Sequence, residues 1–177
     1  FLNNYDEQFF KDYGTKVLIN AIIKNYDLNN KNCLDLGCGL GVVSILLSKE
    51  FNEASFVLSD ITDIAVTLSK ENLKINNCSS FKIIKSDLFE NVEEKFDFII
   101  TNPPIRAGKK IVYEIVMGAK DYLEQNGSLF IVVRKEQGAK SMIRDLEKIY
   151  KVEVLNKIKG FFVIKCELDW LIAQSVL

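Results

Sequence analysis

The sequence predicts an α/β fold, built on a doubly wound, mostly parallel seven-stranded sheet that ends in an antiparallel hairpin. Short apolar runs alternate with helical segments over most of the chain, which is the order of a parallel sheet covered by helices. Near the end, two β-rich runs follow each other around Gly160, which indicates a hairpin. A chain of 177 residues holds one such domain, expected over residues 1–177, and leaves little room for a second.

Seven runs of apolar and β-branched residues are expected to form the strands. The first five are short and continuously apolar, as in strands buried on both faces, and the last two make the hairpin. The expected strands are residues 33–36, 55–58, 81–84, 98–101, 129–133, 152–158 and 161–167.

Helices are expected where apolar residues recur at helical spacing. Thr15 is the expected N-cap of the first helix, and Asn126-Gly127 the expected end of the fourth. The expected helices are residues 16–26, 42–50, 63–76, 110–125 and 141–150. Residues 1–13 are expected to be an N-terminal extension. Residues 169–177 form an apolar-rich tail that either packs on the domain or makes a dimer contact, so both a monomer and a homodimer remain open.

Composition excludes several function classes. The chain has no histidine, which excludes hydrolase triads and the common zinc sites, so no metal is expected. Its four cysteines share no C-x-x-C spacing, and no apolar run has the length of a membrane span. We therefore expect a cytoplasmic protein with no membrane contact. Because the chain begins at Phe1, its native start is expected to lie upstream.

A glycine-rich run, D-L-G-C-G-L-G at 35–41, lies at the end of the first expected strand and opens a helix. Its spacing is G-x-G-x-G, because Val42 stands where a dinucleotide fingerprint needs its third glycine. Asp35 precedes the glycines, and a carboxylate there suits the cationic methionyl amine of S-adenosylmethionine better than a pyrophosphate. The run therefore favours S-adenosylmethionine; a purely structural glycine turn is the alternative.

Two further acids follow the next two strands. Asp60 is placed to accept hydrogen bonds from both ribose hydroxyls of a nucleoside cofactor, or else to cap the following helix. Asp87 could accept from an adenine amino group with Leu88 against the ring, or else belong to a turn. Their recurrence at successive strand ends favours the cofactor interpretation.

The tetrapeptide T-N-P-P ends the fourth expected strand, at the edge of the sheet where ligands bind. Pro103 and Pro104 restrict the backbone, so the Asn102 side chain and the Pro103 carbonyl can accept both hydrogens of one NH₂ group. Asn102, Pro103 and Pro104 are therefore the expected catalytic residues of an N-methyltransferase. The alternative is a proline turn that merely ends a buried strand. Methylation at cytosine C5 needs a cysteine nucleophile near the prolines, and no cysteine lies there, which disfavours that reaction.

These motifs, in this order, resemble those of the methyltransferase small domain family. They are D-L-G-C-G-L-G at 35–41, S-D-I at 59–61, S-D-L-F at 86–89 and N-P-P-I-R-A-G-K at 102–109, and the similarity runs from about Gly14 to Glu167. The resemblance implies the class I methyltransferase fold, S-adenosylmethionine as cofactor and, as in the rRNA guanine-N2 methyltransferases of the family, RNA as partner. The larger rRNA enzymes contain two related domains, and this chain matches only the catalytic one. The expected cofactor-binding residues are Asp35, Gly37, Cys38, Gly39, Gly41, Asp60, Ile61, Asp87, Leu88 and Asn102.

Two features of the sequence bear on the substrate: one residue that differs from the usual pattern of amino methyltransferases, and a group of cationic residues. Ile105 stands where many amino methyltransferases carry an aromatic residue that stacks on the base, so stacking must come from elsewhere. We call residues 102–104 the clamp, because they are expected to hold the acceptor amino group. Arg106 and Lys109 follow this clamp and Arg134 follows the next strand, so all three are expected at one edge of the sheet. We expect Ile105, Arg106, Lys109 and Arg134 to contact substrate, although solvated surface cations explain the charges equally well.

The leading hypothesis is an S-adenosylmethionine-dependent methyltransferase acting on guanine N2 of ribosomal RNA, free or within the small ribosomal subunit. A protein glutamine N5 or adenine N6 methyltransferase uses the same clamp and is the closest alternative. A non-catalytic ribosome-assembly factor that binds S-adenosylmethionine is the third.

Overall fold

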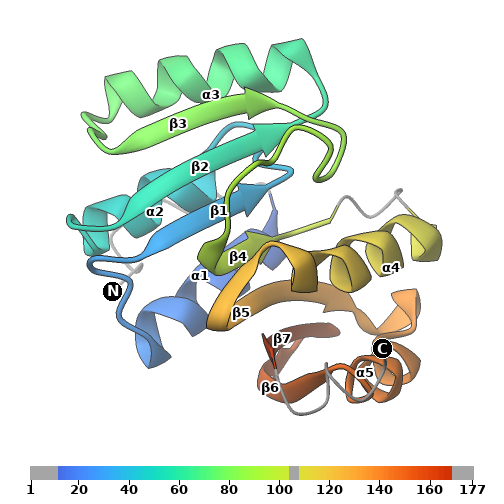
Figure 1. Ribbon diagram of the computed structural model, residues 1–177. Coiled ribbons are helices and arrows are strands. Elements are labelled where there is room, and N and C mark those ends of the chain that lie inside the picture. The colour runs from blue at the N-terminus through green and yellow to red at the C-terminus, as the bar shows by residue number, and fades with distance from the viewer. Residues whose placement is uncertain (1–11, 104–107, 169–177) are drawn as a thin grey trace.

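The structure is a computed structural model that describes residues 12–103 and 108–168 of the chain. It contains one seven-stranded sheet with the strand order β3-β2-β1-β4-β5-β7-β6 (Figure 1). The strands are β1 Asn32–Leu36, β2 Ser55–Asp60, β3 Phe81–Lys85, β4 Phe96–Thr101, β5 Leu123–Arg134, β6 Tyr150–Ile158 and β7 Phe161–Leu168.

The strand pairing confirms the predicted sheet. β1 pairs in parallel with both β2 and β4, and the parallel pairing continues outward to β3 and β5. β7 pairs antiparallel with both β5 and β6, which confirms the terminal hairpin. Because β2 and β4 lie on opposite sides of β1, the chain switches direction there. The carboxyl ends of β1 and β4 therefore border the crevice in which doubly wound folds bind their ligands.

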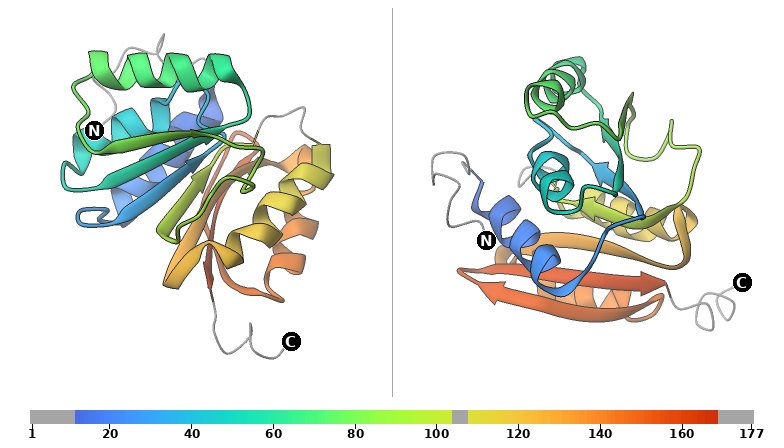
Figure 2. Two further views of the ribbon diagram at one scale, coloured as in Figure 1. Left: turned by 45° about the horizontal axis from the view of Figure 1, so that its top comes forward. Right: turned by 90° about the vertical axis from the view of Figure 1, so that its left-hand side faces the viewer.

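Five α-helices cover the two faces of the sheet. Two separate groups of buried residues show the division: α1, α2 and α3 pack on one face, whereas α4 and α5 pack on the other (Figure 2). Strand neighbours such as Ile99 and Ile100 belong to opposite groups, as the alternation of side chains in a strand requires. The helices are α1 Tyr13–Asn25, α2 Val42–Glu50, α3 Asp63–Ile75, α4 Gly108–Gly118 and α5 Ala139–Leu146, with 3₁₀ turns at Ala119–Asp121 and Lys135–Gln137.

The start of α1 differs from the prediction. The helix begins at Tyr13 rather than Lys16, and its N-cap is Asp12, whose Oδ1 accepts from the Gly14 N–H at 2.9 Å. Thr15 lies inside the helix, so its prediction as the N-cap was wrong. Its hydroxyl instead donates to Asp12 Oδ2 at 3.2 Å. An aspartate is an equally good cap, and it lies one turn earlier than the hydrophobic pattern indicated.

The helix predicted over residues 110–125 was wrong at its end. α4 stops at Gly118, and Leu123 already belongs to β5, where it pairs with Phe96. Asn126-Gly127 is therefore not a helix end but part of an irregularity in β5, because the register shifts between Phe96 and Phe98. A Cβ at Gly127 would lie only 2.9 Å from the Phe96 carbonyl oxygen, so only glycine fits this bulge.

The helix predicted over residues 141–150 was also too long. α5 ends at Leu146, and Tyr150 is the first residue of β6. The Tyr150 ring is fully buried, and its hydroxyl donates to the Val116 carbonyl of α4 at 2.7 Å. Tertiary packing, rather than helical periodicity, determines the conformation of this residue.

Within residues 12–103 and 108–168, no helix has the length and apolar character needed to cross a bilayer.

Candidate active site at the carboxyl edge of the sheet

The glycine loop connects the end of β1 to the start of α2. Gly37, Gly39 and Gly41 all have positive φ angles, of 74°, 53° and 78°. The Ser59 carbonyl of β2 accepts from the Gly37 N–H at 2.8 Å and from the Cys38 N–H at 2.9 Å. These bonds fasten the loop to the neighbouring strand, so its left-handed turns are part of a rigid structure.

The three glycines have different surroundings. A Cβ at Gly41 would lie 3.2 Å from the Ser69 Cβ of α3, so this glycine allows α3 to pack closely. A Cβ at Gly37 or Gly39 would meet nothing within 4 Å, although both residues line a pocket. Their bare backbone therefore forms an open cradle that a ligand can approach closely.

Asp35 supplies a buried carboxylate beneath this cradle. Only 2% of the residue is exposed, and its Oδ2 accepts from the Ser44 hydroxyl at 2.7 Å and from the Ser44 N–H at 3.2 Å. Burial raises the pKa of Asp35 to about 6, although the two bonds from Ser44 act in the opposite direction. A buried carboxylate of this kind can bind a cationic amine, because the amine would replace the lost hydration.

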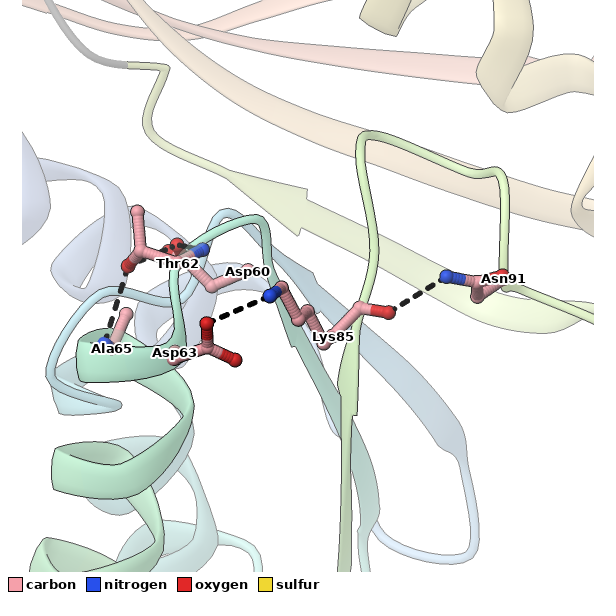
Figure 3. Close-up of polar contacts among 6 residues, drawn as sticks. All are labelled: Asp60, Thr62, Asp63, Ala65, Lys85 and Asn91. Carbon is pink, nitrogen blue, oxygen red and sulfur yellow. Dashed lines mark hydrogen bonds and ion pairs between the residues drawn. The ribbon is translucent and has the colours of Figure 1, made fainter.

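Asp60 ends β2 with both carboxylate oxygens engaged, and Figure 3 shows its contact with Thr62. Oδ2 accepts from the Gly39 N–H at 3.0 Å, and Oδ1 accepts from the Thr62 N–H at 3.0 Å and its hydroxyl at 3.1 Å. Thr62 is the N-cap of α3 and accepts from the Ala65 N–H. Asp60 therefore supports the cap without being the cap, and it links the glycine loop to the start of α3.

The neighbouring end of β3 is held by surface contacts, also visible in Figure 3. Lys85 forms an ion pair with Asp63 at 2.8 Å, and the Asn91 amide donates to the Lys85 carbonyl at 2.9 Å. Asp87 is exposed, and Leu88 adopts a positive φ of 46°. These contacts leave Asp87 at the open edge of the sheet.

Asn102 lies immediately after β4, next to β1. The buried Thr101 hydroxyl donates to the Leu36 carbonyl at 2.8 Å, which ties the end of β4 to the end of β1. The Asn102 side-chain Nδ2 donates to Thr15 Oγ1 at 2.9 Å and also to Asp12 Oδ2. Pro103 is buried. The remaining predicted residues of this segment, Pro104, Ile105 and Arg106, lie outside the described residues.

A pocket of about 710 Å³ joins the glycine loop to Asn102. It is large enough for a nucleoside-sized ligand. The pocket continues along α2 to the end of α3 at Ile75 and Asn76. The predicted residues that line it are Asp35, Gly37, Cys38, Gly39 and Asn102. The predicted residues that do not line it are Gly41, Asp60, Ile61, Asp87 and Leu88.

Asp12 and Thr15, which were not among the predicted site residues, also line this pocket. The pattern Asp-x-Gly-Thr just before an apolar-periodic helix is an N-cap signal, and it could have located Asp12 at the end of a helix. It could not have shown that this helix end faces Asn102. Cys38 lines the pocket as a thiol, because burial raises its pKa to about 12.

Three cation–aromatic pairs lie at the carboxyl edge of the sheet. The Lys109 Nζ lies 5.3 Å from the centre of the Tyr113 ring at the start of α4. The Arg134 guanidinium lies 4.8 Å from the Phe161 ring, so this predicted substrate contact rests on a protein ring. Lys159, which was not predicted, lies 4.9 Å from the Tyr13 ring.

The turn that carries Lys159 lies at the same edge of the sheet as the clamp. Arg134 at the end of β5 pairs with Phe161, and the Lys135 N–H donates to the Gly160 carbonyl at 2.8 Å. The Phe161 and Tyr13 rings are in contact, with 5.6 Å between their centres. Lys109, Arg134 and Lys159 therefore lie on three different elements at the carboxyl edge of the sheet, and Lys109 faces Tyr113 and Asp145.

Comparisons with known proteins agree with this geometry. YbxB of Bacillus subtilis (strain 168) is 39% identical over 159 residues, which cover 88% of this chain and 78% of that protein. Ribosomal RNA small subunit methyltransferase C of Actinobacillus pleuropneumoniae serotype 3 (strain JL03) is 36% identical over 125 residues. That match covers 68% of this chain but only 37% of the relative, so the chain spans little more than a third of its length.

A third relative has another named substrate. A Methanocaldococcus jannaschii protein, named as a candidate protein N5-glutamine methyltransferase, is 32% identical over 160 residues, covering 78% of this chain and 80% of that protein. Among solved structures, the T. thermophilus 16S rRNA N2 G1207 methyltransferase, in complex with AdoMet and guanosine, superposes with a TM-score of 0.77. It is 23% identical, and the match covers 89% of this chain and 43% of that one, which supports the shared fold.

The model of the methyltransferase small domain family matches residues 9–165, a span that contains the glycine loop, Asp60 and Asn102. The fold is that of the class I methyltransferases, in which a mostly parallel sheet ends in antiparallel strands. The chain therefore belongs to the methyltransferase small domain family and is an S-adenosylmethionine-dependent methyltransferase.

Proposed function

We propose that the chain methylates the exocyclic amino group of an RNA base, guanine N2 of ribosomal RNA, in the cytoplasm. The observation that carries this proposal is the Asn102 amide, held by two protein acceptors at the rim of the cofactor pocket. Because Nδ2 donates to Asp12 and Thr15, Oδ1 is the atom of this amide that can accept from a substrate. An acceptor beside a methyl-donor site suits a nitrogen nucleophile that carries hydrogens.

Asn102 and Pro103 would act by positioning. When bound, S-adenosylmethionine supplies an electrophilic methyl group. Asn102 Oδ1 and the Pro103 carbonyl would accept the two N–H hydrogens of the acceptor, which leaves the nitrogen lone pair to point away from both oxygens. Orientation and exclusion of water can supply a large part of the rate enhancement for such a displacement, so no basic side chain is required.

The residues of the glycine loop would hold the cofactor. Asp35 would pair with the methionyl amine, and the bare backbone of Gly37 and Gly39 would allow close approach. The free lone pairs of the Asp60 carboxylate would accept from the ribose hydroxyls. Asp87, with Leu88 and Ile61 beside it, would bind the adenine at the exposed end of the site.

Two further observations support RNA as the substrate. The relatives named as ribosomal RNA small subunit methyltransferase C match 68% of this chain at 34–36% identity. Cationic side chains from α4, β5 and the β6–β7 turn also lie at the edge of the sheet that carries Asn102, where phosphates of a nucleic acid could bind. A flipped base needs an aromatic or guanidinium surface, and Tyr13 and Arg134 are the described side chains that could provide one.

Transfer of a labelled methyl group tests the proposal. Wild-type protein, incubated with tritiated S-adenosylmethionine, is expected to label ribosomal RNA or small-subunit particles. The activity of Asn102→Ala is expected to be lower by roughly 100-fold or more, because one positioned hydrogen-bonding group typically contributes about this factor to the rate. Asn25→Ala is the matched control. The Asn25 amide donates to a carbonyl within α1, at the end of that helix away from Asp12 and Thr15. Failure to label either RNA substrate would overturn the proposed function.

A protein glutamine side chain is the second candidate acceptor. Its amide NH₂ presents the same two hydrogens to the clamp, and the Methanocaldococcus jannaschii relative that matches over 80% of its own length carries that name. Lys109→Glu distinguishes the two substrates, because a reversed charge should weaken RNA binding but leave methylation of a short glutamine peptide unchanged. Label in the peptide rather than in RNA would support the second candidate. Binding of the cofactor without any transfer would support a non-catalytic assembly factor.

A further inference from the structure

We propose that Asp12 and Thr15 are positioning residues that fix which way the Asn102 amide faces. An asparagine side chain can be turned by half a rotation, which exchanges its acceptor oxygen with its donor nitrogen. Only the orientation with Oδ1 toward the acceptor can receive an N–H. The inference rests on the proposed function, because it assumes that Oδ1 receives the substrate NH₂.

The contacts define one orientation. Asp12 Oδ2 is an acceptor only, so it selects the nitrogen of the Asn102 amide as its partner. The Thr15 hydroxyl accepts from the same nitrogen at 2.9 Å while donating its own hydrogen to Asp12 Oδ2 at 3.2 Å. Both hydrogens of Nδ2 are therefore matched by acceptors. If the amide turned over, its oxygen would face the Asp12 carboxylate, which repels it.

Asp12 and Thr15 are themselves held in place. Asp12 Oδ1 caps α1 through the Gly14 N–H, and a negative charge at this end of the helix is favourable. Gly14 lies against the Phe161 ring, where an added Cβ would come within 3.0 Å of the ring carbon Cε1. Behind it, the face of α1 that includes Leu18 and Ile22 is fully buried. The packing of α1 therefore holds Asp12 and Thr15 in fixed positions.

The two Asp12 oxygens allow the cap and the positioning contact to be separated. In Asp12→Asn the remaining oxygen can still cap α1, and asparagine is as good an N-cap as aspartate. Its new amide nitrogen would replace Oδ2 and face another donor, Asn102 Nδ2. Asn102 is then expected to turn over and to present a donor to the substrate. We expect kcat to fall roughly 100-fold, as when one preorganised hydrogen bond is lost, with the binding of S-adenosylhomocysteine within twofold of wild type.

A reciprocal exchange provides the decisive test. In the double variant Asp12→Asn with Asn102→Asp, the carboxylate at position 102 can accept from the amide at position 12 with one oxygen and from the substrate with the other. We expect the double variant to recover most of the activity lost in Asp12→Asn, whereas Asn102→Asp alone sets two carboxylates against each other and is expected to be defective. Thr15→Ser is expected to retain activity that Thr15→Val loses.

The controls separate this inference from the proposed function. Asp27→Asn makes the same change of charge beyond the far end of α1, where Asp27 bonds only to Asn29 among the described residues, and it is expected to behave as wild type. Wild-type kcat in Asp12→Asn, no recovery in the double variant, or a loss confined to cofactor binding would each overturn the inference. If wild-type protein methylates no RNA, the side-chain ¹⁵N–¹H NMR signals of Asn102 still test its contact with Asp12 and Thr15. These signals are expected to shift in Asp12→Asn and Thr15→Val but not in Asp27→Asn. Unchanged signals in the first two variants would refute the contact.

Discussion

Asp35 connects the chemistry of the site to pH at the scale of a single residue. Its carboxylate is buried, and burial raises its pKa to about 6. The protonated form is therefore favoured in the folded protein, so the stability that this group contributes is present at pH below about 4 and is lost as the pH rises through 6. A cationic amine in the pocket reverses this preference, because it favours the ionised carboxylate.

The affinity for S-adenosylhomocysteine should consequently fall as the pH is lowered. One proton must leave Asp35 when the amine binds below pH 6, so we expect a dissociation constant about tenfold larger at pH 5 than at pH 7, from one proton released per bound amine. Asp35→Asn should bind more weakly at pH 7 and lose the pH dependence. Isothermal titration calorimetry at both pH values measures this difference, and equal affinity of the wild-type protein at pH 5 and 7 would show that Asp35 does not meet the amine.

The sequence alone located those site residues that lie at or just after the ends of strands, because parallel strands deliver their carboxyl ends to one edge. Asp35 and Asn102 were selected in this way, and both line the pocket. Asp12 was not selected, because its contact with Asn102 joins residues 90 positions apart and belongs to the start of a helix on one face of the sheet. No local pattern contains such a contact.

At the scale of elements, the prediction succeeded in the sheet and failed where a helix gives way to a strand. Continuous apolar runs identified all seven strands to within a few residues, except that β5 begins six residues earlier than predicted, at Leu123. Leu123 fits the helical pattern of α4 but pairs with Phe96. Tyr150 likewise continues the pattern of α5 but begins β6. Long-range pairing determined both boundaries, and periodicity carries no information about it.

Tyr150 provides the test at this scale. Its hydroxyl donates to the Val116 carbonyl in the last turn of α4 at 2.7 Å, in a buried contact. Tyr150→Phe removes this buried hydrogen bond, so we expect a loss of about 1–2 kcal/mol in the free energy of unfolding. Urea denaturation measures the loss, and cofactor binding should not change.

Tyr113→Phe is the matched control for that measurement. The Tyr113 hydroxyl donates to Asp145 at 2.6 Å in a partly exposed contact, where water can replace it. We expect its removal to change the free energy of unfolding by less than about 0.5 kcal/mol, as for most surface substitutions. Equal stability of Tyr150→Phe and wild type would contradict a structural role for the β6–α4 contact.

For the whole molecule, charge distribution matters more than total charge. The chain carries a formal net charge of −1, so it has no general attraction for nucleic acid. Lys109 and Lys159 nevertheless lie at the clamp edge of the sheet, each over an aromatic ring. The proposed binding of RNA would therefore depend on a few cations at this edge of the sheet.

The salt dependence of RNA binding tests this distribution. Lys109→Gln and Lys159→Gln are each expected to reduce the slope of log K against log salt concentration by roughly one, as for the loss of one phosphate contact. Lys24→Gln, in the last turn of α1 and far from the clamp, should leave the slope unchanged. Filter-binding titrations between low and moderate salt provide the slopes, and equal reductions in all three variants would indicate a diffuse electrostatic attraction instead.

The most direct test of the central claim is mass spectrometry of nucleosides from ribosomal RNA that has been treated with the protein and deuterium-labelled S-adenosylmethionine. An N-methyltransferase with Asn102 as its clamp predicts labelled N2-methylguanosine from the wild-type protein and none from Asn102→Ala. Label in a carbon-methylated nucleoside, or equal amounts of labelled N2-methylguanosine from both proteins, would contradict it.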